Sequence, residues 1–358
     1  MENILILDVG NSNTKCFIYQ VDRINREPRG VDYEATPIYE EQQRTNRGHP
    51  WDLIDTCRCL LARAIKAHAP KYGMLTAFGD AFVYYDPVTN NRPRFVFADE
   101  PVPDNITHDL DIDYETAGFP TGNIEIRGVR ALRAKHKAAW KSIVPVNVFL
   151  GAELCRKEAW RNWDITQASA TGDYNISNGD WVSDGIPVCQ PSDEIGTFKD
   201  DPISVRTPPA FQEMTLLAGG LDNAFLDTTE QTPYIVAGTW LVVSTIHDEF
   251  RPTETQRQHG VRWFISGNGR YLAQTVRRSE RPLTDQRVHD IFSDFQAMGL
   301  NGGDYQKIRV TGAYAKELTA KLNRFSTENY FNFQFMDHGE QFKQSAIYVY
   351  KHKEATME

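Results

Sequence analysis

Residues 4–19 carry a carboxylate, a glycine and a lysine at a spacing that suits the binding of a phosphorylated ligand. The apolar run Ile4–Leu7 leads to Asp8, and Gly10 and a polar turn then lead to Lys15 and a second β-rich run. This pattern predicts two strands joined by a short turn. Backbone N–H groups and small hydroxyls in such a turn can surround an anion, and a carboxylate beside them can hold a hydrated metal ion. An ordinary hairpin with a glycine turn is the alternative.

Two later stretches could also do chemistry. Residues 219–223 read Gly-Gly-Leu-Asp-Asn and place Asp222 in a turn where glycines let a ligand approach the backbone. A carboxylate held near an alcohol can accept its proton, and such base catalysis is typically worth about 10²–10⁴-fold in rate. Asp222 is therefore a candidate general base; the alternative is that it caps a helix that begins near Asn223. Gly238 and Thr239 follow between two β-rich runs.

The elements that must position these residues are read from the spacing of apolar side chains. Apolar residues at helical spacing predict an amphipathic helix over 51–68. The same reasoning predicts strands at 74–78, 82–85 and 94–97, a helix over 129–160 interrupted at Pro145, and helices over 288–298 and 315–322. Strands mixed with helices in this way favour an α/β architecture.

Composition excludes several classes of protein. The chain of 358 residues is long enough for two domains, and 41% hydrophobic with 24% charged residues is typical of a soluble globular protein. A net charge of −9 argues against nucleic-acid partners and anchoring on an anionic membrane. There is no apolar run of about 20 residues and no basic leader with a cleavage site, so we expect a cytoplasmic protein. The five cysteines lack metal-ligand spacing, and whether the chain forms a homodimer is left open.

The order of these features resembles that of the FGGY family of carbohydrate kinases. The run from Asp8 to Lys15 resembles the family's first phosphate loop, the turn at 219–223 resembles its catalytic turn, and Gly238-Thr239 resembles its second phosphate loop. Gly238-Thr239-Trp240 is similar to the Gly-Thr-Trp of the kinases that act on L-fuculose and L-rhamnulose, as is the run at 76–80. Residues 164–171 resemble a further family stretch, Asp-x-Ser-x-Ala-Ser-x-Thr, and the likeness covers roughly residues 3–245.

The resemblance implies an α/β fold of two ribonuclease-H-like (actin/hexokinase-type) domains with a cleft between them. Residues 1–232 would form the N-terminal domain, which binds the sugar and carries the first phosphate loop. Residues 233–358 would form a reduced C-terminal domain that binds the nucleotide. The implied activity is ATP-dependent phosphorylation of a primary hydroxyl of a small-molecule sugar, a ketose or a deoxyketose such as L-fuculose, with ATP and Mg²⁺ as cofactors.

The resemblance also implies roles for single residues. Asp8 would hold Mg²⁺, Asp222 would be the base and contact the sugar, and Asp80 and Asp99 would bind sugar hydroxyls, unless they are solvated loop carboxylates. The residues implied to bind the nucleotide are Gly10, Asn11, Ser12, Asn13, Thr14, Lys15, Gly238, Thr239 and Gly312. The indoles of Trp163 and Trp181 either stack on the sugar or pack in the core, and packing is favoured.

The chain departs from the family pattern in its last third. Only 119 residues follow Thr239, and the adenosine turn has the single glycine Gly312 where two or three are usual. Tyr314 in this turn either blocks a nucleotide or stacks on its adenine. A non-catalytic relative that binds a sugar or a nucleotide is therefore an alternative. The opening also resembles type III pantothenate kinases, which are much shorter and lack the Gly-Gly-x-Asp-Asn turn.

Overall fold

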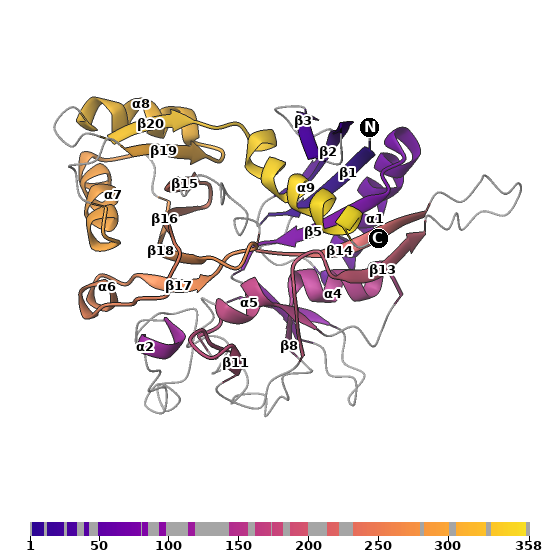
Figure 1. Cartoon of the computed structure of the whole chain (residues 1–358), viewed down its shortest axis with the longest axis horizontal. Coiled ribbons are helices and arrows are strands. Elements are labelled where there is room, and N and C mark those ends of the chain that lie inside the picture. Colours follow the sequence, from indigo (N-terminus) through magenta and orange to yellow (C-terminus); the bar gives the residue numbers. More distant parts are fainter. Residues whose placement is uncertain are drawn as a thin grey trace, which may run out of the picture.

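Two mixed β-sheets, each flanked by helices, form the frame of the molecule (Figure 1). The chain is described here by a computed structural model. The described residues are 2–10, 13–24, 27–33, 39–42, 49–79, 81–84, 93–97, 114–118, 143–156, 162–172, 174–181, 187–199, 213–221, 232–279, 283–300, 306–326 and 331–355.

The first sheet has the strand order β13-β14-β5-β1-β2-β3, and β4 pairs with β2 beside this path. β1, β2 and β3 are antiparallel neighbours, whereas β1, β5 and β14 run parallel. The strands are β1 (Glu2–Val9), β2 (Asn13–Ile24), β3 (Glu27–Tyr33), β4 (Tyr39–Gln42), β5 (Tyr72–Ala77), β13 (Glu194–Lys199) and β14 (Glu213–Leu221). The carboxyl ends of the three parallel strands therefore meet at one edge.

The second sheet repeats this arrangement, with the order β17-β18-β16-β15-β19-β20. β15, β16 and β18 are antiparallel neighbours, and β15, β19 and β20 run parallel. The strands are β15 (Tyr234–Ala237), β16 (Trp240–His247), β17 (Arg262–Ile265), β18 (Tyr271–Arg278), β19 (Gln306–Thr311) and β20 (Phe331–Phe335). The predicted boundary at residues 232–233 lies between the two sheets in sequence and stays a prediction.

Helices cover the faces of the sheets. The predicted helix over 51–68 is confirmed as α1 (Pro50–His68), which begins with a capping box at His49 and packs with α4 (Val146–Leu154) on one face of the first sheet. α7 (Asp285–Ala297) and α8 (Ala315–Phe325) contact the second sheet. The short helices are α2 (Tyr114–Ala117), α5 (Ile165–Ser169) and α6 (Glu254–Gln258). None of the helices in the described ranges combines the length and apolar character that a bilayer crossing requires.

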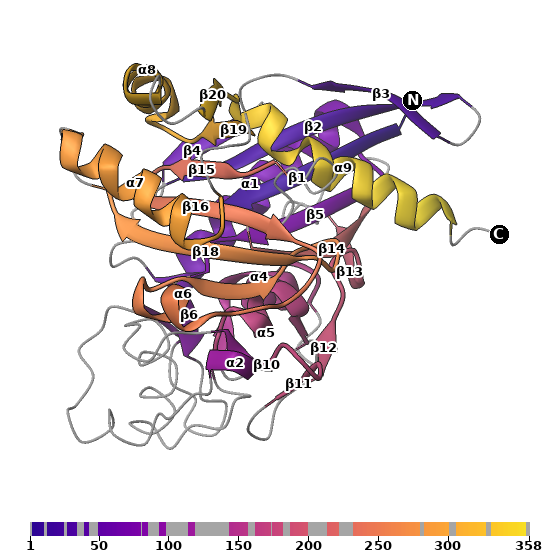
Figure 2. The ribbon, with the colours of Figure 1, turned by 60° about the vertical axis from the view of Figure 1, so that its left-hand side comes forward.

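The last helix, α9 (His338–Ala355), follows the second sheet in sequence but packs on the first (Figure 2). The alternation of side chains along β1 explains this, because a strand points successive residues to opposite faces. Leu5 and Leu7 lie in the cluster that includes α1, whereas Ile4 and Ile6 lie in a second cluster with α9. Both clusters contain residues of the second sheet, but in the second cluster apolar residues of β15, β16, β17 and β18 join only α9, the segment just before it and the strands of the first sheet, so this face of β1 is turned, with α9, toward the second sheet.

One predicted helix is wrong at its centre. The helix expected over 129–160 contains the strand β8 (Ile143–Pro145), and α4 begins only after it. β8 pairs with β6 (Ala81–Tyr84), which also pairs with β7 (Arg94–Phe97). β-branched residues ahead of a proline favour an extended backbone, and here pairing with β6 decides the outcome.

Two pairs of very short strands complete the fold. β9 (Trp163–Asp164) pairs with β12 (Val188–Cys189), and β10 (Tyr174–Asn175) pairs with β11 (Asp180–Trp181). They lie in sequence on either side of α5, whose residue Ser169 reaches the second sheet. The Ser169 hydroxyl oxygen accepts a hydrogen bond from the Ile265 backbone N–H at 2.9 Å, so α5 connects the two halves.

Candidate functional site

A row of three polar side chains crosses the first sheet near the carboxyl ends of its parallel strands. Asp8 of β1 lies opposite Lys15 of β2 and beside Thr76 of β5. Residues paired in this way share a face, and it is the face of Ile4 and Ile6, which is turned to the second sheet. Asp8 is 5% exposed and Thr76 1%. The row thus places the carboxylate of Asp8 beside the ammonium group of Lys15 in a largely buried environment.

The turn that follows Asp8 is closed tightly. The Gly10 N–H donates to the Asn13 carbonyl oxygen at 3.0 Å, and a Cβ at Gly10 would lie only 3.1 Å from that oxygen. Thr14 is fully buried and lies beside Val9, on the opposite face from Asp8 and Lys15. The structure therefore brings Asp8 and Lys15 together, but it directs the side chain of Thr14 to the other side of the sheet.

Five predicted site residues lie outside the described residues: Asn11, Ser12, Asp80, Asp99 and Asp222. For Asp222, the preceding strand is informative. Leu221, the last residue of β14, pairs with Ala77, and Ala77 pairs with Val9. The chain therefore leaves β14 at the same sheet edge where Asp8 lies. Gly219 is required for this, because a Cβ there would lie 2.6 Å from the Leu75 carbonyl oxygen.

Gly238 and Thr239, which resemble a second phosphate loop, lie in a hairpin turn between two strands as predicted, and their phosphate role stays a prediction. Gly238 and Thr239 connect β15 to β16, and the Gly238 N–H donates to the Trp240 carbonyl oxygen at 3.0 Å. A Cβ at Gly238 would meet only that oxygen, at 3.9 Å, so the space above the turn is open. The Ser279 N–H, just after β18, donates to the Thr239 carbonyl oxygen at 3.1 Å and fixes the turn from the neighbouring strand.

The two hairpins have the same topology but different chemistry. In the second hairpin, Val236 and Val242 form the pair one step before the turn, where the first hairpin has Asp8 and Lys15. Val236 also pairs with Thr311 of β19, as Asp8 does with Thr76 of β5. Of the two, the first hairpin therefore has the charges that a metal ion and a phosphate need.

The predicted adenosine turn lies against the second hairpin. Gly312 has a φ of +102°, and a Cβ there would lie 2.6 Å from the Ala237 carbonyl oxygen. The Tyr314 N–H donates to the same oxygen at 3.0 Å. Glycine at 312 is thus required for two reasons, because its backbone conformation is unfavourable for other residues and because β15 lies directly against it.

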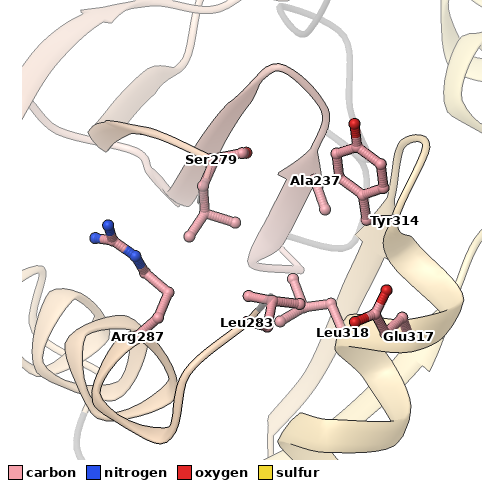
Figure 3. Close-up of a pocket in the computed structure, with 8 residues that line it drawn as sticks. Ala237, Ser279, Leu283, Arg287, Tyr314, Glu317 and Leu318 are labelled. Carbon is pink, nitrogen blue, oxygen red and sulfur yellow. The ribbon is translucent and has the colours of Figure 1, made fainter. Parts of the chain in front are cut away.

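A pocket opens beside this turn, between β15, β16, α7 and α8 (Figure 3). Its cavity volume is about 20 Å³, which is about the space of one water molecule, and most of the atoms around it are apolar. The residues around it are Ala237, Leu241, Ser279, Leu283, Arg287, Tyr314, Glu317 and Leu318. The Tyr314 ring lies on one side of this pocket (Figure 3). Stacking of this tyrosine on a nucleobase stays a prediction.

The stretch at 164–171 has a supporting role. Asp164 caps α5 by accepting hydrogen bonds from the backbone N–H groups of Thr166 and Gln167, and Asn147 donates to its second oxygen. Complete burial raises the pKa of Asp164, although these hydrogen bonds oppose the shift. Trp163 is fully buried and stacks on Phe82 at 5.9 Å, so packing is confirmed for this indole.

A magnesium ion fits the first hairpin better than a metal held entirely by protein. No group of three or more histidine, cysteine, aspartate or glutamate side chains within the described ranges could hold a metal ion. Mg²⁺ usually keeps several waters and takes one or two carboxylates together with phosphate oxygens. Asp8, a largely buried carboxylate opposite Lys15, fits that mode.

Sequence reasoning missed the residues that complete these surfaces. Thr76 lies in the run at 76–80 without an assigned role, Arg287 directly precedes the predicted helix over 288–298, and Glu317 lies inside the predicted helix over 315–322. For Arg287 and Glu317 a signal was available, since both lie in the first turn of a helix, α7 and α8. The first turn of a helix that starts at the end of a sheet faces the loops at that end. To predict which helix faces which loop, however, one needs the strand order.

We expect Gly312→Ala to destabilise the protein more than Gly299→Ala. Both glycines have positive φ, at +102° and +92°, but nothing lies within 4 Å of a Cβ at Gly299. Gly299→Ala should lose about 1–3 kcal/mol of unfolding free energy from backbone strain alone. Gly312→Ala should lose about 1–3 kcal/mol more, because Ala237 must move. Urea unfolding of both variants measures the difference, and equal losses would contradict the close contact.

Solved structures of sugar kinases share this fold. A xylulose kinase and a gluconate kinase from Lactobacillus acidophilus each match with a TM-score of 0.66, at 12% and 13% identity, and each match covers 99% of this chain and 90% of the other. A carbohydrate kinase from Novosphingobium aromaticivorans has a TM-score of 0.66 at 11% identity, covering 97% of this chain and 92% of its own. No protein-family model and no curated protein matches the sequence. The matches confirm the predicted two-domain actin/hexokinase-type α/β fold.

Proposed function

We propose that this protein is an ATP- and Mg²⁺-dependent kinase that phosphorylates a primary hydroxyl of a sugar in the cytoplasm. The observation that carries the proposal is the row formed by Lys15, Asp8 and Thr76 at the first hairpin, on the face turned to the second sheet. Its charges are suited to a metal–phosphate group, and the fold around it is shared with sugar kinases.

In this proposal the two hairpins bind the phosphate chain from opposite sides. Gly10 to Lys15 contribute backbone donors and a positive charge, and Gly238 and Thr239 close from the second sheet. Asp8 orients the hydrated Mg²⁺, and the bound ion supplies positive charge that offsets the charge of the phosphates. The nucleobase binds beside Gly312 against Tyr314, where the small pocket between α7 and α8 must widen to receive it. Most of the catalysis of phosphoryl transfer comes from such positioning and electrostatics.

Asp222 has the role of general base. It accepts the proton of the sugar's primary hydroxyl as the hydroxyl oxygen attacks phosphorus, which is how a weak nucleophile becomes reactive at neutral pH. Its place in sequence directly after β14 supports this role, because β14 ends at the sheet edge where Asp8 lies. Asp80 follows β5 in sequence, which ends at the same edge, and Asp80 and Asp99 are proposed to bind other sugar hydroxyls.

A ketose or deoxyketose, such as L-fuculose, is the proposed acceptor. The structural neighbours include a xylulose kinase and a gluconate kinase, whose named substrates both end in a primary alcohol. The panel for a coupled turnover assay is therefore D-xylulose, D-gluconate, L-fuculose and L-rhamnulose with Mg-ATP. Sugar binding without ATP binding or turnover would favour a non-catalytic relative instead, and turnover of pantothenate would favour the remaining alternative.

Asp222→Asn should lower kcat on the best sugar by about 10²–10⁴-fold with little change in the KM for that sugar, because the amide retains contacts but cannot accept the proton. Steady-state kinetics measure both constants. The matched control is Asp55→Asn, which removes a carboxylate from the exposed face of α1, where the side chain is 77% exposed. A variant at position 222 as active as the wild type would exclude the assigned base.

Asp8→Asn should raise the Mg²⁺ concentration for half-maximal activity by about 10- to 100-fold, because the ion loses a charged partner. A Mg²⁺ titration at saturating ATP and sugar measures this shift. An unchanged magnesium requirement, with the variant folded by circular dichroism, would remove Asp8 from the metal site.

Tyr314→Ala should weaken ATP binding by about 5- to 150-fold, since stacking of a base on an aromatic ring is worth about 1–3 kcal/mol. Tyr314→Phe keeps the ring and should bind ATP almost as the wild type does. Calorimetric titration of both variants tests this. Tighter binding to the alanine variant would show that the tyrosine obstructs the nucleotide.

A further inference from the structure

The indole of Trp240 carries a buried hydrogen-bond donor that no described residue uses. Trp240 is the first residue of β16, directly after Gly238 and Thr239. Its Nε1–H is shielded from solvent, and no acceptor for it exists in the part of the chain that the structure describes. Buried tryptophan N–H groups normally have a partner, because an unpaired buried donor costs free energy. A bound ligand could supply the acceptor that the described residues do not.

The position of Trp240 places this donor on the side of the proposed phosphate site. Residues two apart in a strand share a face, so Trp240 shares its face with Val242, Ser244 and Ile246. Ile246 belongs to the apolar cluster that contains Ile4 and Ile6 of the first sheet. The Trp240 indole thus lies on the face turned to the first sheet, as Asp8 and Lys15 lie on the face turned to the second.

A cation lies next to this donor. Arg278, the last residue of β18, pairs directly with Trp240 and so shares its face. Its side chain is exposed and forms no salt bridge with any described residue. The preceding Arg277 points to the other face, where it bonds to the buried Asp294 with its Nε at 3.3 Å. Of these two successive arginines, Arg277 is thus paired with a buried carboxylate, and Arg278 has no salt bridge among the described residues.

We infer that Trp240 and Arg278 form an oxyanion-binding pair for the terminal phosphates of the bound nucleotide. This inference rests on the proposed kinase function and adds two residues to its nucleotide site. A neutral N–H and a guanidinium both donate and neither accepts, so their natural ligand is a group that only accepts, such as a phosphoryl oxygen. The open space above Gly238 lets a phosphate chain pass over the turn, from the pocket lined by Tyr314 to the face of Trp240.

Calorimetric titration with Mg-ATP and with adenosine tests the pair. Trp240→Phe keeps an aromatic ring and removes only the N–H, and Arg278→Gln removes the charge. Each variant should bind Mg-ATP about 10- to 100-fold more weakly, the range expected for a hydrogen bond to a charged group, and should bind adenosine as the wild type does. Equal Mg-ATP affinity in the wild type and both variants would overturn the inference.

Trp263→Phe is the matched control. The Trp263 indole N–H donates to the Gln256 side-chain oxygen at 3.2 Å, so this substitution removes a satisfied hydrogen bond and should lower the Tm. Trp240→Phe removes an unsatisfied donor and should leave the Tm of the ligand-free protein unchanged or raise it. A loss of Tm in Trp240→Phe as large as in Trp263→Phe would mean that the Trp240 N–H has a partner inside the protein, which would overturn the inference.

Indole ¹⁵N–¹H spectra identify the ligand group directly. The chain has seven tryptophans, and Trp240→Phe assigns the peak of interest by its loss. Mg-ATP and magnesium pyrophosphate should each shift this peak, and D-xylulose alone should not. A shift with D-xylulose only would assign the donor to the sugar and overturn the phosphate assignment.

Failure of the inference can be told from failure of the proposed function. A shift with pyrophosphate in a protein that binds no ATP would retain the oxyanion pair and reject the kinase. ATP binding and sugar turnover without any shift would retain the kinase and reject the pair. No response to either phosphate compound would reject the pair.

Discussion

The register of the first hairpin is the constraint on which the candidate site depends. Antiparallel pairing sets Asp8 opposite Lys15, and parallel pairing with β5 sets Thr76 beside them. A slip by one residue would turn Asp8 into the apolar cluster under α1, because side chains alternate between faces. Ile4 and Ile6 on one face and Leu5 and Leu7 on the other are all buried and apolar, so they do not by themselves set the register. The slip is opposed because it would bury the Asp8 carboxylate among apolar side chains. The position of this one charge therefore helps to keep the acid and the base together on the face turned to the second sheet.

The repeated topology separates two kinds of chemistry. At equivalent positions the first hairpin has Asp8 and Lys15, and the second has Val236 and Val242. The second sheet instead has an open turn at Gly238, an apolar pocket, and the donor and cation of Trp240 and Arg278. In the proposed function, the metal ion and its phosphates bind at the charged hairpin and the nucleobase binds beside the apolar pocket, so the nucleotide spans the two sheets.

Local patterns predicted the strands, the hairpins and their glycines, because these depend on residues close together in sequence. The helix over 51–68 and the turn at Gly238 are confirmed for this reason. The helix expected over 129–160 is wrong at residues 143–145 because pairing with β6, which is distant in sequence, decides that segment. The row with Thr76, the pocket and the Trp240–Arg278 pair follow from strand order, which no local pattern contains. The role of Asp222 stays a prediction, although the end of β14 brings the chain to the right edge.

The start of α9 links the two parts of the candidate site physically. Tyr19 of β2 donates its hydroxyl hydrogen to the Gly339 carbonyl oxygen at 2.8 Å, and the Thr311 hydroxyl donates to the Gln341 side-chain oxygen at 3.3 Å. Tyr19 lies four residues after Lys15 on the same face of β2, and Thr311 directly precedes Gly312. One helical turn therefore contacts both the strand that carries the cation of the first hairpin and the strand that leads into the adenosine turn. Since both hydrogen bonds are buried, a rotation of one sheet against the other must either move α9 with it or break one of them.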